Sequence, residues 1–506
     1  MSTALAQGEI GELAQIVGSE WVLDQREQLL PYAVSLDPAG DCFPATVLRP
    51  GSREEVQRIV EVANRRGLSL HPISRGMQHG LGMATAVAPD TVTIELSRMD
   101  RILEYDDELG YVVLEPGVTF AQLHRFLEEH GGRYWCSPIS GPVEASVLGN
   151  ALDKGAGYTP VGNHFGNLIG LEVVIGDGRV LTTGDGALPG AKTTYTHKGG
   201  CGPMLDALFA QSNYGIVTKA GVWLMPAPPG ARGFVFSVPD YDDLGRAVDV
   251  AGRLKLTGGI PSTISIANDV FCLAVEAAEP RPMAEPGAAP IDEGELPALR
   301  EAHGIGAWNV VGCIYGPSET LEARVEKLEQ AFAATGPLAY LPEEEARERK
   351  AFGYRFDIAK GVPNETELDV YNLHPNGTSL YFLPSVPFRG AEALEAMRLS
   401  RLICTEHGFA YTNQFLCSPR SMRNTQPVIF DGGADGAAQR ARDCFSELTS
   451  RFADSGYLVS RPPTHFQQEV MDGLGLHAEL ARSVKRAFDP NGVLDPGRFG
   501  LSLEDR

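Results

Sequence analysis

The sequence predicts a two-domain protein of the α+β class, and three observations point to it. Glycine-rich stretches at 71–82, 149–166 and 211–226 are interspersed with strand-like and helix-like segments. The run Pro-Ala-Pro-Pro-Gly-Ala-Arg at 226–232 then breaks the pattern, and strands and helices resume to about residue 457. With 506 residues, 43% of them hydrophobic, the chain can bury two cores of ordinary size. We therefore expect a domain boundary near residue 226.

The first elements follow from periodicity. A helix is predicted over 53–66, because apolar residues three and four apart share one face and Gly67 follows the last turn. The segment 68–73 is predicted to be a strand that leads into the first glycine-rich stretch. Residues 91–96 and 111–115 are rich in β-branched and other apolar residues and predict two more strands.

Caps and turns place the next elements. Thr119 supplies an N-cap for a helix over 119–130, and Asp177-Gly178 predicts a hairpin within 171–181. A strand at 233–238 opens the second domain. The stretch 278–297, rich in Pro, Ala, Gly and Glu, is predicted to be a surface excursion and not a further boundary. A last helix is expected at 476–488.

Net charge, cysteine spacing and the lack of long apolar runs limit the binding partners and the cellular compartment that we expect. The net charge of −22 disfavours nucleic-acid binding, which needs concentrated Lys and Arg, although a basic protein partner stays open. There is no C-x-x-C pair, so reduced thiols are expected and no metal site. The N-terminus lacks a basic segment followed by an apolar run, and no stretch reaches membrane-spanning length. We expect a cytoplasmic protein that binds no membrane.

The three glycine-rich stretches together predict a backbone-lined phosphate cradle. In the first, Gly76, Gly80 and Gly82 allow positive φ and a close approach of main-chain amides to a phosphate. The stretch contains neither G-x-G-x-x-G nor the lysine of a P-loop. A dinucleotide is therefore the expected ligand, although each stretch alone would be an ordinary turn.

With these stretches in place, the chain resembles the vanillyl-alcohol oxidase and p-cresol methylhydroxylase family of FAD-dependent oxidoreductases, and most of all its p-cresol methylhydroxylase branch. Further stretches that carry the resemblance lie at 114–120, 353–355, 361–364 and 489–498, in family order. The resemblance implies an FAD-binding domain with an α+β cap domain over the flavin. It divides the chain into residues 1–226 of the FAD-binding domain, 227–457 of the cap, and 458–506 returning to the FAD-binding domain.

The resemblance also implies the cofactor-binding residues. The family's histidyl tether falls on Ser379, and its helper histidine falls on Cys42, so a histidyl link to FAD is not expected. Tyr371 matches the tyrosyl tether of the p-cresol methylhydroxylase branch, and His374 is a weaker candidate for the tether. The alternative is that Tyr371 is an ordinary half-buried tyrosine of a strand, with a structural role only. The residues expected at the cofactor are Ser74, Arg75, Gly76, Met77, Gln78, His79, Gly149, Asn150, Gly155, Gly157, Tyr158, His164, Gly215, Ile216, Val217, Tyr371 and Arg498.

Three residues match catalytic positions of the family. Glu367 falls on a pocket glutamate suited to accept a proton or to orient water, and a solvated loop carboxylate is the alternative. Arg461 matches an arginine that stabilises a phenolate, and its guanidinium suits a carboxylate or an enolate equally. Gln414 matches a pocket-lining position from which it would hydrogen-bond substrate.

The sequence departs from the family at the phenol clamp. The two tyrosines that hold a phenolate fall on Leu81 and Ser460, and with Ser379 these residues are expected to line the substrate pocket. Losing two hydroxyl donors costs about 1–3 kcal/mol each if the contacts were charge-assisted. A simple 4-alkylphenol is therefore not the expected substrate.

The resemblance implies an oxidoreductase that removes hydride from a benzylic-type C–H or alcohol carbon of a small aromatic or conjugated molecule. The electron acceptor would be O2 or an acceptor protein, and the enzyme a homodimer. Two alternatives stay open: oxidation of a non-phenolic alcohol or hydroxy acid, and a flavin-binding subunit without turnover of its own.

Overall fold

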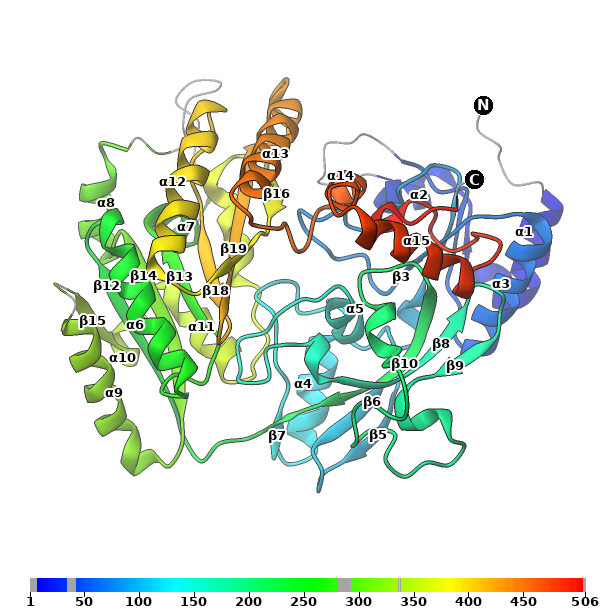
Figure 1. Cartoon of the computed structure of the whole chain (residues 1–506), viewed down its shortest axis with the longest axis horizontal. Helices are drawn as coiled ribbons and strands as arrows, with labels where there is room; N and C mark the ends of the chain where they lie inside the picture. The colour runs from blue at the N-terminus through cyan, green and yellow to red at the C-terminus, as the bar shows by residue number, and fades with distance from the viewer. Residues whose placement is uncertain are drawn as a thin grey trace.

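The computed structural model describes residues 7–33, 42–277, 279–280, 291, 293–334, 336 and 338–503. Its elements form two groups (Figure 1). Two smaller sheets and the C-terminal helices lie together on one side, and one large sheet with its own helices lies on the other. The predicted α+β class is confirmed. In the part of the chain described, no helix is long and apolar enough to cross a membrane.

The first sheet has the strand order β1-β2-β4-β3, with β2, β4 and β3 parallel. The helix predicted at 53–66 is confirmed as α3, which buries its apolar face and ends at Gly67 in the left-handed conformation. The bounds in this part are α1 Gln7–Val17, β1 Val22–Leu23, α2 Arg26–Ala33, β2 Thr46–Leu48, α3 Arg53–Arg66, β3 Leu70–Ile73 and β4 Val92–Glu95.

The second sheet is antiparallel, in the order β5-β6-β10-β8-β9. The predicted hairpin at Asp177-Gly178 joins β8 to β9, and Thr119 caps the predicted helix by accepting from the Gln122 N–H at 3.1 Å. The bounds are β5 Ile102–Asp106, β6 Tyr111–Leu114, α4 Phe120–Glu129, β7 Tyr134–Trp135, α5 Val147–Leu152, β8 Leu168–Ile175, β9 Val180–Thr182, β10 Gly215–Trp223 and β11 Met225–Pro226.

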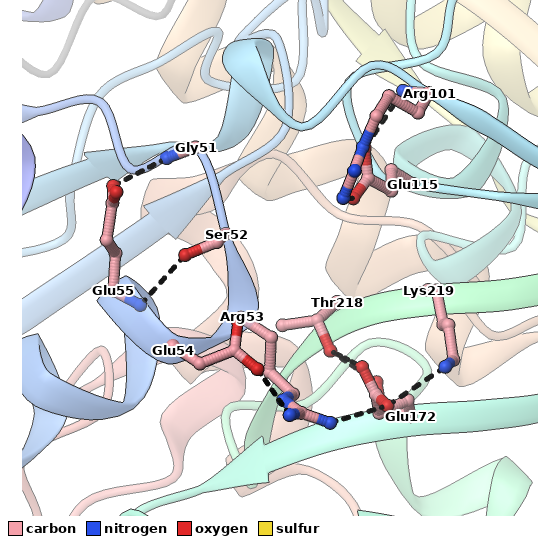
Figure 2. A network of polar contacts seen from close by, with 10 residues as sticks. All are labelled: Gly51, Ser52, Arg53, Glu54, Glu55, Arg101, Glu115, Glu172, Thr218 and Lys219. Carbon is pink, nitrogen blue, oxygen red and sulfur yellow. Dashed lines mark hydrogen bonds and ion pairs between the residues drawn. The ribbon is translucent and has the colours of Figure 1, made fainter.

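A polar network joins α3 to the second sheet, as Figure 2 shows. Ser52 caps α3 by accepting a hydrogen bond from the Glu55 N–H at 3.2 Å. From the first turn, Arg53 reaches the Glu172 carboxylate on β8, which also pairs with Lys219 on β10 at 3.1 Å. Because Glu172 is only 7% exposed, these partners offset the cost of burying its charge.

The large sheet is antiparallel, in the order β15-β12-β14-β13-β18-β19-β16, with β17 beside β19. Alternate side chains point to opposite faces, so Phe234 and Phe236 of β12 pack under α6, α9, α12 and α13, while Val235 faces α7 and α11. The bounds are β12 Ala231–Val238, α6 Leu244–Leu256, β13 Ile264–Asn268, α7 Asp269–Glu276, α8 Leu296–His303, β14 Trp308–Tyr315, α9 Ser318–Ala333, β15 Ala339–Pro342, α10 Glu343–Ala346, α11 Lys350–Ala359, β16 Gly377–Phe382, β17 Ser385–Pro387, α12 Gly390–Glu406, β18 Gln414–Cys417, β19 Ser421–Asp431 and α13 Ala437–Asp454. The predicted excursion at 278–297 lies mostly outside the described residues.

The C-terminal segment returns to the two smaller sheets. It forms α14 (Gln467–Asp472) and α15 (Leu476–Phe488), and Leu494 then pairs in parallel with Leu70 of β3. The buried Lys485 ammonium donates to the carbonyls of Asn213 and Leu494, each at 2.7 Å, and pairs with Asp489. On these contacts we propose the division into 1–226, 227–457 and 458–506.

Replacement of Lys485 by Met should weaken the attachment of the C-terminal segment to the smaller sheets and lower the free energy of unfolding. The Asp489 carboxylate is fully buried and would lose the ammonium that pairs with it, which costs about 3–5 kcal/mol. We expect Lys485→Met to unfold at clearly lower urea than wild type, with unfolding followed by the release of flavin fluorescence. The exposed neighbour gives the control, Arg486→Met, which should shift the midpoint little. Equal midpoints for wild type and Lys485→Met would contradict the assigned pairing.

Candidate active site

One large cavity lies between the two groups of elements, and both contribute to its wall. The smaller sheets supply the loop after β3, the start of α5 and the start of β10, and the C-terminal segment adds residues near 494–499. The large sheet and its connections supply the other side, with Glu367, Tyr381, Leu383, Leu416, Arg423 and Thr425. A ligand in this cavity would contact both proposed domains.

The loop after β3 forms a cradle of main-chain donors. Among the described residues, the N–H groups of 75–79 have no hydrogen-bond acceptor, although this segment lines the cavity. Such consecutive free amides bind anions. Gly76 has a φ of +65°, and a Cβ there would lie 2.6 Å from that of Ala84, so the loop requires glycine at this position.

The facing wall comes from α5, the loop after it and β10. A Cβ at Gly149 would lie 2.9 Å from Ser74 Oγ, so glycine lets α5 approach the cradle closely. Asn150 hydrogen-bonds His164 Nδ1 at 2.6 Å. Burial, with the charges of Arg461 and Arg423 in addition, lowers the pKa of His164 to about 4. His164 is therefore a neutral residue that orders this wall.

The residues present fit FAD. The cradle offers unpaired amides for a pyrophosphate, and the buried Nε of Arg75 has no partner among the described residues. Arg498 lines the cavity beside them and donates to Thr464 Oγ1 at 2.7 Å. The sequence-predicted cofactor residues that line the cavity are Ser74, Arg75, Gly76, Met77, Gln78, His79, Gly149, Asn150, Tyr158, Gly215, Ile216, Val217 and Arg498.

Four predicted cofactor residues lie outside the cavity lining. Gly155 and Gly157 belong to the loop that holds His164, since a Cβ at Gly157 would lie 2.4 Å from His164 Nε2. His164 itself stands behind Asn150. The fourth is Tyr371, described below.

A buried cluster surrounds Glu367, which lies in the short helix Thr366–Leu373 and lines the cavity with 5% of its surface exposed. Its Oε1 accepts from Gln414 Nε2 at 2.7 Å, and its Oε2 accepts from the Tyr354 hydroxyl at 2.7 Å. The Tyr158 hydroxyl reaches the same oxygen at 3.5 Å. Glu367 is thus a fixed carboxylate at the cavity wall and not a solvated loop residue.

Arg355, from α11, completes the cluster from behind. Its Nη1 donates to Gln414 Oε1 at 2.8 Å and lies 3.9 Å from Glu367 Oε2. Gln414 is fully buried between the two and is not part of the cavity lining. Its amide therefore links Glu367 to Arg355, instead of facing substrate as the sequence suggested.

Tyr371 lies at the edge of the cavity. Its hydroxyl is 3.1 Å from Ser379 Oγ, and its ring centroid is 6.4 Å from that of His79, a cavity residue. Burial raises the pKa of Tyr371 to about 12. Neither Tyr371 nor Ser379 belongs to the lining, whereas the neighbouring Tyr381 does.

Two arginines occupy one part of the wall. Arg461 Nε donates to Asp153 Oδ2 at 2.5 Å, with the arginine side chain 14% exposed. Arg423, from β19, lines the same cavity and donates to the Lys154 carbonyl at 3.0 Å. Leu81 also lines the cavity, whereas Ser460 does not, and the Ser460 hydroxyl donates to the Leu383 carbonyl.

Sequence reasoning did not single out Arg355, Tyr354, Arg423, Asp153 or Tyr381 as site residues. Arg355 carried a signal, because it stands between Tyr354 and Phe356 in a helix, and an arginine that is buried among aromatic residues needs a partner. The sequence signal for Arg423 was weaker: it is the charged residue in a run of polar residues within a strand. The partners of both depend on tertiary contacts between distant segments.

Comparison with known proteins agrees with this geometry. Residues 44–184 match the family model of an FAD binding domain. The chain is 33% identical to the 4-cresol dehydrogenase (hydroxylating) flavoprotein subunit of Pseudomonas putida, over 99% of this chain and 97% of that protein. It is 29% identical to 1'-carboxy-chondrochloren decarboxylase of Chondromyces crocatus, over 90% and 91%. The crystal structure of p-cresol methylhydroxylase with substrate bound superposes with a TM-score of 0.96 at 32% identity, covering 100% of this chain and 99% of that chain.

Fold and site together define an FAD-dependent oxidoreductase. The chain belongs to the family of the p-cresol methylhydroxylase flavoprotein subunit, within the vanillyl-alcohol oxidase group that the sequence resembles. The predicted fold type and the FAD cofactor are confirmed.

His164 should make stability depend on pH. Its pKa is about 4 in the folded protein and 6.5 as the reference for an unfolded chain. Between these values the unfolded state binds more protons, so the free energy of unfolding falls as the pH drops. Wild type should lose about 2 kcal/mol more than His164→Gln between pH 7 and pH 5, measured by urea unfolding. Parallel pH profiles for the two proteins would contradict a buried neutral histidine.

Proposed function

We propose that this flavoenzyme oxidises a benzylic-type C–H or alcohol carbon of a small aromatic or conjugated substrate bound beside Glu367. The observation that carries the proposal is that Glu367, fixed by its cluster, lines the same cavity as the cradle for FAD. When bound, FAD supplies the hydride acceptor. The product is a hydroxylated, desaturated or carbonyl compound, depending on whether water adds.

The residues of the cradle hold the cofactor. The amides of 75–79 bind the pyrophosphate, and Arg498 places positive charge beside the cofactor. Tyr371 is the proposed point of covalent attachment, with Ser379 Oγ as a hydrogen-bond partner of its hydroxyl. Ser379 thus supports the tyrosine at the position where histidyl-linked relatives carry their tether.

Glu367 handles the proton. Two tyrosine hydroxyls and the Gln414 amide fix both carboxylate oxygens, which orients the group before substrate binds. Arg355 acts through Gln414 and is a positioning residue. The retained cluster supports turnover, and it disfavours the alternative of a flavin-binding subunit without its own reaction.

The substrate is not a simple 4-alkylphenol in this proposal. Leu81 offers no donor to a phenolate, and the Ser460 hydroxyl is used by the Leu383 carbonyl. Arg461 remains as an anchor for an anionic group, which also supports the second candidate, a non-phenolic alcohol or hydroxy acid.

The proposal also covers the electron acceptor, the oligomeric state and the cellular compartment of the enzyme. The P. putida relative is the flavoprotein subunit of a dehydrogenase. This supports an acceptor protein for the present enzyme, with O2 as the alternative. We further propose a cytoplasmic homodimer.

Anaerobic mixing tests the proposed reaction. The holoenzyme is mixed with substituted benzyl alcohols, alkylphenols and 2-hydroxy acids, and the visible flavin absorbance is followed by stopped flow. Bleaching by substituted benzyl alcohols supports the proposal, whereas bleaching by simple 4-alkylphenols alone would contradict the proposed loss of the phenol clamp. Bleaching by aliphatic hydroxy acids alone would favour the second candidate, and no bleaching by any of them would contradict both.

Replacement of Glu367 by Gln should slow flavin reduction. The amide keeps the shape but cannot accept a proton, so we expect a loss of about a hundredfold or more in the reduction rate. FAD content should stay that of wild type. The control is Glu365→Gln, an exposed carboxylate two residues away, with an unchanged rate. An unaffected rate in Glu367→Gln would remove Glu367 from the chemistry.

Replacement of Tyr371 by Phe should abolish covalent flavin attachment. The ring still fills its place, but the phenol oxygen that would carry the bond is absent. On a denaturing gel under ultraviolet light, wild type should fluoresce and Tyr371→Phe should not. Tyr340→Phe, on β15 away from the cavity, should fluoresce like wild type. Fluorescence that persists in Tyr371→Phe would place the link elsewhere.

A further inference from the structure

A second cavity adjoins the first at β19. Its lining includes Lys255, Thr263, Ser418 and Arg423. Arg423 belongs to the wall of both cavities, as do Ala156 and Leu416. Arg423 therefore lies where the second cavity meets the one that Glu367 lines.

Positive charge is in excess at this junction. Among the described residues of the second cavity, Lys255 and Arg423 carry charge and no Asp or Glu lines the wall. In the first cavity, Asp153 is paired with Arg461. The other two carboxylates are held elsewhere, Glu367 in its cluster and Asp495 by His71 at 2.9 Å. Among the described residues, Arg423 is thus left without an ion pair to a carboxylate, in a protein whose net charge is −22.

The hydrogen-bond donors left over suit an anion with two oxygens. Among the described residues, the hydrogen bonds of Arg461 use only Nε, and those of Arg423 use only one Nη group. A guanidinium presents parallel N–H groups, which match a carboxylate better than a single phenolate oxygen. The hydroxyl donors that would serve a phenolate are missing at Leu81 and occupied at Ser460.

The mutual effect of the two arginines agrees with their closeness. Burial, together with the charge of Arg461, lowers the pKa of Arg423 to about 10. Arg423 therefore remains charged near neutral pH, and a bound anion would offset the repulsion that it experiences from Arg461.

We propose that Arg423 and Arg461 together bind the carboxylate of an aromatic acid, and that the second cavity is the route by which this acid reaches the site. The inference rests on the proposed function, because it names the substrate class of the same site. It assigns specificity to Arg423, a residue that neither the sequence motifs nor the Glu367 cluster involves.

Calorimetric titration of the holoenzyme tests the proposal without requiring turnover. The probes are 4-methylbenzoate, its neutral isostere 4-methylbenzamide, and 4-methylphenol. Wild type should bind the benzoate at least about tenfold more tightly than the other two, the range expected for a charge-assisted pair. Arg423→Gln should lose about tenfold or more in benzoate affinity while its amide affinity stays unchanged.

Two further variants separate the effect of the Arg423 charge from a general effect of substitution. Arg423→Lys retains the charge and should bind the benzoate between wild type and Arg423→Gln, and Arg420→Gln, an exposed arginine nearby, should match wild type. Flavin content checks folding in each case. Equal affinity for benzoate and benzamide in wild type, or an Arg423→Gln protein that binds the benzoate like wild type, would overturn the proposal. Failure of the proposed function would instead appear as tight benzoate binding with no aromatic compound able to bleach the flavin.

Discussion

The buried carboxylate of Glu367 is the constraint on which the site depends. A carboxylate with 5% exposure is tolerated only when its oxygens are hydrogen-bonded. Its partners come from a helix, a strand and a loop: Tyr354 on α11, Gln414 on β18, and Tyr158 beyond α5. The large sheet must therefore be formed and docked on the smaller ones before the site exists. In the proposed function, the chemistry and the docking of the two proposed domains are therefore coupled through the Glu367 side chain.

The two sides of the cavity have different physical roles. The loop of 74–79 offers main-chain donors and glycine, which suit a phosphate-bearing cofactor. This holds for any substrate that the enzyme oxidises. The side formed by β19 and the segment of Arg461 offers charged side chains, which in our proposal select among small molecules. Substitutions on the second side can change the substrate while the cofactor site stays intact. The proposed loss of the two clamp tyrosines at Leu81 and Ser460 would be a change of this kind.

Local signals predicted much of the fold and of the cofactor side. Periodicity and caps placed α3 and α4, and Asp177-Gly178 placed a hairpin, because short-range contacts decide these elements. The glycines of the cradle were visible because backbone conformation demands them. The substrate side was harder to predict. Gln414 was expected to face substrate and instead links Glu367 to Arg355, since its surroundings come from segments far apart in the chain. The pairing of Arg461 with Asp153 joins residues 308 positions apart, which no local pattern reveals.

A crystal structure of the holoenzyme with 4-methylbenzoate tests the central claim most directly, namely that one cavity between the two groups of sheets takes both FAD and an aromatic acid. The account predicts FAD on the cradle of 75–79 with continuous density to Tyr371. It also predicts the carboxylate against Arg423 and Arg461, with the ring toward Glu367. FAD bound away from the cradle, or a benzoate with its carboxylate turned from both arginines, would contradict it.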